Sequence, residues 1–162
     1  MLSAKIEDAL NKQLNDELFS SYLYLSMAAY LETTPFEGFA HWMKLQSKEE
    51  YEHGMKFFGF INEIGGKVKL NAMEAPKSDW TDPQQVFEAA LEHEYKITNG
   101  INNLVGLAIE EKDYATNLFL NYFVKEQVEE VASVIKIIEK FKMIGESKNG
   151  LFWLDKELKK RA

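Results

Sequence analysis

Apolar residues recur along four long stretches of the chain in alternating steps of three and four, the spacing of one face of an α-helix. The pattern predicts helices over about residues 3–32, 37–64, 83–111 and 114–144. The four stripes are Leu10, Leu14, Glu17, Ser21, Tyr24, Ala28 and Leu31; Phe39, Met43, Gln46, Glu50, His53, Phe57, Phe60 and Ile64; Phe87, Leu91, Glu94, Thr98, Ile101, Val105 and Ala108; and Leu120, Phe123, Gln127, Glu130, Val134, Ile137 and Phe141.

The residues between the stripes fix the ends of these helices and their order in space. Ser3 and Asp82 are suitable N-caps, and Pro35 and Gly65 end the first and second helices. The segment from 67 to 83, which opens on a strand-like run at 67–70, is too long for a hairpin. It can cross the whole bundle, so we expect an all-α four-helix bundle with one long crossover and parallel second and third helices.

A short fifth helix is expected over about 147–160. It carries Leu151, Leu154 and Leu158 on one face, and Phe152 and Trp153 point elsewhere. Because four helices already close the bundle, we expect this helix to pack against copies of itself in an oligomer. A helix folded back on its own bundle is the alternative.

Each stripe also carries a glutamate near its middle, and the second stripe adds a histidine one turn further on. An isolated carboxylate in an apolar stripe costs several kcal/mol, or takes up a proton. One cation of charge two or three at the bundle centre would remove this cost for all four. No lysine or arginine lies on any stripe, which argues against a purely structural bundle of paired charges. Iron, manganese or zinc would suit such ligands.

Length and composition narrow the class of protein. A chain of 162 residues with 46% hydrophobic residues suits a single domain, 1–162, with the bundle at about 3–144. The absence of cysteine excludes disulfides, thiolate metal sites and iron–sulfur clusters, and favours a reducing compartment. The charged start is no signal peptide and no run is long enough to span a membrane, so we expect a cytoplasmic protein. A net charge of −7 disfavours nucleic acid as a partner.

Several short motifs give the chain a resemblance to the non-haem ferritins of bacteria and archaea over nearly its full length. They are Asn15-Asp16-Glu17-Leu18, Ser20-Ser21-Tyr22-Leu23-Tyr24, Glu37-Gly38-Phe39-Ala40, Glu49-Glu50-x-x-His53, Glu92-His93-Glu94, Glu110-Glu111-Lys112-Asp113-Tyr114, Phe123-x-x-Glu126-Gln127-Val128-Glu129-Glu130 and Leu154-Asp155-Lys156-Glu157-Leu158. The resemblance implies a ferroxidase centre in every subunit and iron storage, as ferric mineral, in a hollow shell of about 24 subunits.

Position by position, the resemblance implies two iron sites. Glu17, Glu50 and His53 would hold the first iron, and Glu50, Glu94 and Glu130 the second. Gln127 stands where a second Glu-x-x-His pair would have its glutamate, and Glu130 where it would have its histidine. This asymmetry separates ferritins from the bacterioferritins and many di-iron oxidases. We expect the second iron to bind less tightly, with Gln127 counted among the metal-site residues.

The resemblance further implies a third iron site, formed by Glu49, Glu126 and Glu129 with Glu130; a merely solvated acidic face is the alternative.

Other residues are candidates for roles around the centre. Tyr24 lies two turns after Glu17, where its hydroxyl could bond a ligand carboxylate or give up an electron, and Tyr122 is a further candidate; a simple core tyrosine is the alternative. His41 and His93 lie off the stripes and are expected to be surface or interface histidines. Tyr51 stands near the place of the methionine that haem-binding relatives use, so no haem is expected.

Two other functions remain open. A di-iron or di-manganese oxidase or peroxidase that stores no metal would usually carry the second Glu-x-x-His pair, which this chain lacks. A mini-ferritin that protects DNA would place iron between subunits and generally lacks the fifth helix.

Overall fold

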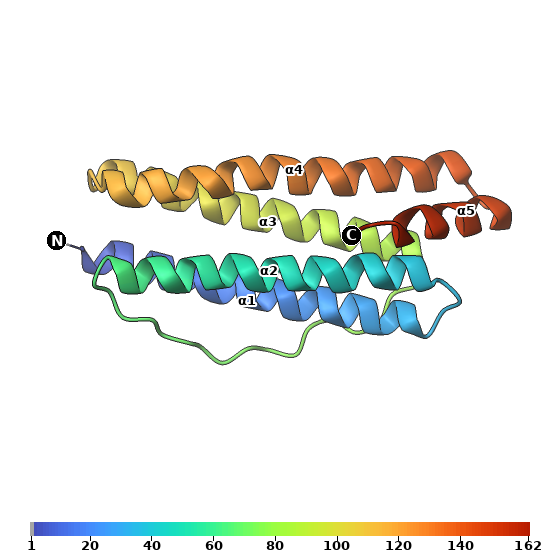
Figure 1. Cartoon of the computed structure of the whole chain (residues 1–162), viewed down its shortest axis with the longest axis horizontal. Coiled ribbons are helices and arrows are strands. Elements are labelled where there is room, and N and C mark those ends of the chain that lie inside the picture. Colours follow the sequence, from blue (N-terminus) through green and yellow to red (C-terminus); the bar gives the residue numbers. More distant parts are fainter. Residues whose placement is uncertain (1) are drawn as a thin grey trace.

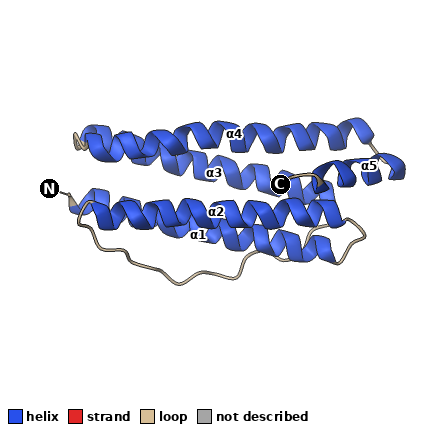
Figure 2. Cartoon of the chain, in the orientation of Figure 1, coloured by secondary structure: helices blue, strands red, loops and turns tan. Residues whose placement is uncertain are grey.

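Residues 2–162 of the computed structural model form five helices: α1 (Ala4–Glu32), α2 (Glu37–Glu63), α3 (Pro83–Glu110), α4 (Tyr114–Ile144) and α5 (Lys148–Lys159). The four long helices lie side by side, and α5 turns back against one end of the bundle (Figure 1). Within these residues every regular element is a helix, and the helices are joined by loops and turns without strands (Figure 2). The expectation of an all-α bundle with a short fifth helix is therefore confirmed.

The helix starts lie where the capping residues indicate. Ser3, Asp82, Asp113 and Ser147 each accept a hydrogen bond from a backbone N–H in the first turn of the following helix. Such caps satisfy amide groups that have no partner inside the helix. The ends agree with the sequence-based ranges to within a residue or two because the breakers are unambiguous.

The connection between α2 and α3 runs the length of the bundle, so these two helices are parallel, as expected (Figure 1). Its start, the strand-like run 67–70, forms no strand. Asn11 on α1 donates to the carbonyl of Lys67 at 2.9 Å and accepts from the N–H of Lys69 at 2.7 Å. One turn on, Asn15 bonds the carbonyl of Lys69 and the N–H of Asn71 in the same way, both at 2.9 Å. Side-chain amides thus replace the partner strand that this extended segment lacks.

The fifth helix folds back on its own bundle, which was the alternative and corrects the expectation that this helix packs against copies of itself. Leu154 and Leu158 are buried in the apolar cluster at this end. Asp155 accepts a hydrogen bond from the N–H of Phe39 at 2.9 Å and so caps α2, which has no side-chain cap of its own. The absence of a side chain at Gly38 lets α5 approach, because a Cβ there would lie 1.7 Å from the carbonyl oxygen of Asp155.

The buried residues form two apolar clusters with a polar layer between them. One cluster, with Phe39, Phe87 and Phe141, lies towards α5; the other contains Phe57 and Phe123. The buried glutamates belong to neither cluster and occupy the middle of the helices. The fold therefore places a cluster of buried apolar side chains on each side of the buried glutamates.

Candidate metal centre

Four glutamates, one from each long helix, meet at mid-length together with His53. Glu17, Glu50, Glu94 and Glu130 are 0–7% exposed, and His53 is 4% exposed. One ligand atom each of Glu17, Glu50 and His53 lies within 4.8 Å of the others, and the same holds for Glu50, Glu94 and Glu130. Glu50 is common to both groups, so the two sets predicted from the sequence lie next to each other.

Neutral donors hold the carboxylates in place. Gln13 donates to Oε1 of Glu17 at 2.9 Å. Gln46 donates to Oε1 of Glu50 at 3.0 Å and to Oε2 of Glu130 at 2.7 Å, and thereby joins α2 to α4. Sequence reasoning assigned no role to either glutamine. Gln46 could have been found, since it lies on the second stripe one turn before Glu50, but Gln13 lies off the first stripe and gave no signal.

Gln127 faces the centre through its amide nitrogen. This nitrogen donates to Oε2 of Glu94 and to Oγ1 of Thr98, both at 3.1 Å. The hydroxyl of Tyr24 donates to the other carboxylate oxygen of Glu94. In this arrangement the amide nitrogen of Gln127 orients Glu94, and a role of Gln127 at the metal site stays a prediction.

The electrostatics show the cost of gathering these acids without a compensating charge. Burial, followed by the charge of Glu50, raises the pKa of Glu17 well above its ordinary value. The same two causes raise the pKa of Glu94 to about 7 and that of Glu130 to about 8. Burial also acts to raise the pKa of Glu50, but the hydrogen bond and charge of His53 outweigh it, so this pKa is lowered. The cluster therefore holds protons near neutral pH in the metal-free chain.

These residues fit a bound cation. Among residues 2–162, Oε2 of Glu17 is buried without a hydrogen-bond partner. None of the ion pairs of the four glutamates in this part of the chain involves lysine or arginine. Buried carboxylate oxygens with a single imidazole nitrogen are ligands suited to iron, manganese or zinc. A cation would replace the shared protons and satisfy the open oxygen.

His53 is held between carboxylates on both ring nitrogens. Nδ1 lies 3.3 Å from Oε2 of Glu50 and 4.0 Å from Oε2 of Glu17. Nε2 faces Oε2 of Glu126 at 3.7 Å. Burial acts to lower the pKa of His53, but the hydrogen bond and charge of Glu50 raise it. Glu126 is thus the acceptor nearest the outer nitrogen, a partner that the sequence did not identify.

A cavity of about 210 Å³ opens beside the centre. The residues predicted for a third iron all line it, together with an arginine from the C-terminal tail. The lining residues are Trp42, Gln46, Glu49, Glu126, Glu129, Glu130, Ser133 and Arg161. Within this group Glu126 and Glu130 approach His53, and one ligand atom of each of the three lies within 4.8 Å of the others. Glu130 therefore belongs both to the centre and to the cavity.

The remaining candidates lie outside the cluster. Tyr122 is 41% exposed, and its ring lies 6.3 Å from that of His53 and 4.7 Å from the ammonium of Lys56. His93 bonds the hydroxyl of Ser20 at 2.7 Å between α1 and α3, and burial lowers its pKa. His41 bonds the carbonyl of Arg161 at 2.7 Å. Both histidines thus make contacts within the chain.

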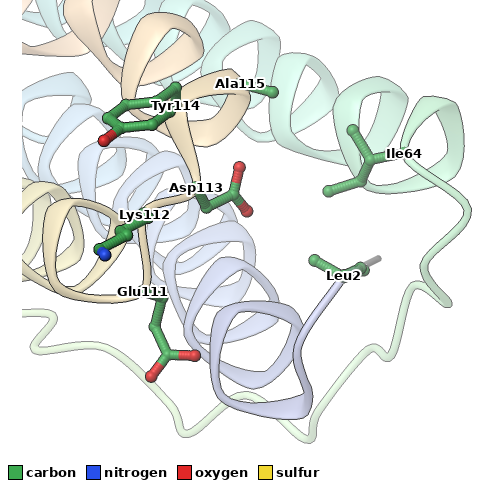
Figure 3. Close-up of a pocket in the computed structure, with 7 residues that line it drawn as sticks. All are labelled: Leu2, Ile64, Glu111, Lys112, Asp113, Tyr114 and Ala115. Carbon is green, nitrogen blue, oxygen red and sulfur yellow. The ribbon is translucent and has the colours of Figure 1, made fainter.

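A second cavity, of about 580 Å³, lies at the other end of the bundle around the turn between α3 and α4 (Figure 3). Its carboxylates are already engaged. Asp113 caps α4 by accepting from the N–H of Thr116 at 3.0 Å, and Glu111 lies 3.5 Å from the ammonium of Lys5. This cavity therefore offers no comparable set of free ligands.

No helix within residues 2–162 combines the length and hydrophobicity needed to cross a membrane.

Fold and site together define a class: four-helix bundles with one long crossover and a carboxylate–histidine cluster at the centre. The ferritin-like domain matches residues 7–144. The chain is 42% identical to the bacterial non-heme ferritin of Bacteroides fragilis over 161 residues, which cover 99% of this chain and all of that protein. It is 40% identical to that of Staphylococcus aureus over 162 residues, covering all of this chain and 98% of the relative.

Solved structures agree with the sequence matches. An open pore ferritin from the archaeon Archaeoglobus fulgidus is 49% identical and superposes with a TM-score of 0.99, over all of this chain and 99% of that one. The chain belongs to the ferritin family.

Proposed function

We propose that this protein stores iron: it oxidises Fe(II) at the buried centre and keeps Fe(III) as a mineral inside a hollow shell of about 24 copies. The whole chain, 1–162, acts as one domain, and the shell resides in the cytoplasm. The observation that carries the proposal is the meeting of Glu17, Glu50, His53, Glu94 and Glu130 in a buried cluster without lysine or arginine.

In this proposal Fe(II) is the substrate, and Glu50 bridges two positions for it. Glu17 and His53 complete the first position, and Glu94 and Glu130 the second. Each Fe(II) gives up one electron, and the pair of electrons reduces dioxygen to hydrogen peroxide, or hydrogen peroxide to water, with protons taken from solvent. Anionic oxygen ligands favour this step because hard carboxylates stabilise the ferric ion more than the ferrous ion.

The unequal ligation of the two positions supports storage over a permanent cofactor. The second position has no imidazole, and both of its outer carboxylates already accept hydrogen bonds, Glu94 from Gln127 and Glu130 from Gln46. Glu130 also lines the acidic cavity together with Glu49, Glu126 and Glu129, the residues proposed for a third position. An ion that leaves the second position thus meets further carboxylates on its way out.

Assembly is supported by the relatives, which are ferritins along their whole length, and by exposed aromatic residues. Phe152 and Trp153 on α5 remain 56% and 53% exposed in the isolated chain. Exposed aromatic side chains of this size are typical of surfaces that are covered by a partner. The leucine face of α5 is used within the chain, so these two residues are the part of α5 left for contacts between copies.

Mixing the metal-free protein with excess Fe(II) in air, followed by size exclusion with iron detection, tests the proposal. Storage predicts iron that elutes with a particle of several hundred kilodaltons, at far more ions per chain than the three ligand groups could hold. His53→Ala should slow the rapid oxidation and leave the particle size unchanged. Iron that stays at the level of these ligand groups, on a small oligomer, would instead indicate an oxidase that stores no metal.

A further inference from the structure

The last turn of the chain places a positive charge in the acidic cavity. Nη2 of Arg161 donates to Oε2 of Glu49 at 2.7 Å, and Nη1 donates to the backbone carbonyl of Trp42 at 3.3 Å. The guanidinium carbon lies 4.5 Å from the centre of the Trp42 ring, within the range of a cation–π contact. The Arg161 side chain is 21% exposed, so this is a docked residue and not a free tail.

The backbone at this point is anchored as well. The carbonyl of Arg161 bonds Nε2 of His41 at 2.7 Å, which fixes the tail against α2. Arg161 thus contacts Glu49, His41 and both the carbonyl and the ring of Trp42, whereas an exposed ion pair alone contributes little to holding a side chain. The anchoring therefore keeps the guanidinium at the mouth of the cavity.

The charges around the cavity are unequal. Among the residues that line it, four are glutamates, Glu49, Glu126, Glu129 and Glu130, and Arg161 alone is basic. The guanidinium contacts Glu49, whose side chain is 48% exposed. A metal ion that uses Glu49 must therefore compete with Arg161 for the negative charge of the same carboxylate.

We propose that Arg161 is a counter-ion of this cavity. In the metal-free chain its guanidinium pairs with Glu49, and this ion pair lowers the affinity of the outer position for a divalent cation. The inference rests on the proposed function, because it concerns the third position assigned there. Its consequence is an outer position that is weak enough to pass metal on and does not retain it.

The size of the effect follows from the exposure of the pair. A half-exposed ion pair contributes up to about 1 kcal/mol, and solvent screens the repulsion between the guanidinium and the incoming cation. Removing the charge should therefore tighten the outer position by about three- to fivefold, while the buried positions, which Arg161 does not contact, stay unchanged.

Titration calorimetry of the assembled, metal-free protein with Zn²⁺ tests the proposal without any oxidation. The variants are Arg161→Gln, which removes the charge but can still bond the Trp42 carbonyl, and Arg161→Lys, which keeps the charge. Each is measured with and without Glu49→Gln, so that the Glu49-dependent binding can be isolated as in a double-mutant cycle. Lys159→Ala is the matched control, since Lys159 forms a comparable ion pair between α5 and α2, 2.9 Å from Glu37, outside the cavity lining.

The proposal expects Arg161→Gln to tighten the Glu49-dependent Zn²⁺ site about three- to fivefold, with Arg161→Lys and Lys159→Ala within twofold of the unmodified protein. An unchanged or weaker Glu49-dependent site in Arg161→Gln overturns the role of Arg161 and leaves the proposed function intact. If Glu49→Gln removes no Zn²⁺ binding in the unmodified protein, the third position of the proposed function fails, and the role of Arg161 falls with it. Anomalous scattering from Zn²⁺ in crystals of each variant identifies the affected position directly.

Discussion

The hydroxyl of Tyr24 on α1 donates its hydrogen to Oε1 of Glu94 on α3, across the middle of the bundle. Both side chains are fully buried, so water cannot replace either partner. Burial, followed by the charge of Glu94, raises the pKa of the Tyr24 phenol well above its ordinary value. The phenol therefore stays protonated and acts as a fixed donor to one of the proposed iron ligands.

Tyr24→Phe should destabilise the metal-free protein and slow iron oxidation. The substitution leaves a buried carboxylate oxygen without its donor, which costs about 1–3 kcal/mol. Thermal unfolding and stopped-flow oxidation of Fe(II) measure the two effects. Tyr30→Phe serves as the control, because Tyr30 packs against Trp80 with ring centres 5.6 Å apart, away from the centre. Equal behaviour of the two variants would show that Tyr24 is only a packing residue.

Glu17→Gln should separate metal binding from folding. Because burial raises the pKa of Glu17 well above its ordinary value, the carboxylate costs stability at pH 8, and a neutral amide of the same shape removes that cost. We expect the melting temperature of the metal-free variant at pH 8 to equal or exceed that of the unmodified protein. The additional stability gained with Zn²⁺ should shrink, because one ligand is lost. A Zn²⁺-dependent gain of the original size would remove Glu17 from the centre.

The metal-free protein should lose stability as the pH rises from about 4.5 to 8. The folded-state pKa values of Glu94 and Glu130 are about 7 and about 8, above the ordinary 4.5, so the folded chain binds more protons than the unfolded chain in this window. Stability then falls with rising pH, because deprotonation is easier in the unfolded state. Bound metal reverses the trend, since it favours the ionised carboxylates. Melting temperatures at several pH values, with and without Zn²⁺, should therefore diverge towards pH 8; parallel curves would contradict the coupling.

Particular residues show which parts of the fold and of the site can be predicted from the sequence. Periodicity places Glu17, Glu50, Glu94 and Glu130 on the inner face of their helices, and the long crossover settles which helices are parallel. Periodicity cannot predict hydrogen bonds made by residues off the stripes, so the sequence does not reveal that Gln13 bonds Glu17. It also says nothing about which surface a terminal segment reaches. The fold-back of α5 and the position of Arg161 in the cavity depend on packing between elements distant in the chain, which no local pattern records.

Alanine substitutions at two glycines of α2 should have opposite effects on stability, because only one of these glycines touches α5. Gly38→Ala would place a Cβ 1.7 Å from the backbone oxygen of Asp155, so α5 must shift and the cap that Asp155 provides to α2 is lost. Losing such a cap alone costs about 1 kcal/mol. At Gly59, also on α2, a Cβ would meet nothing within 4 Å, and Gly59→Ala should stabilise the helix by up to about 1 kcal/mol.

Thermal unfolding and limited proteolysis near Gly145 report on both variants. Faster cleavage in Gly38→Ala and not in Gly59→Ala is the expected result, because only the first substitution pushes α5 off the bundle; equal protection in both would mean that the close contact at Gly38 does not hold α5 in place.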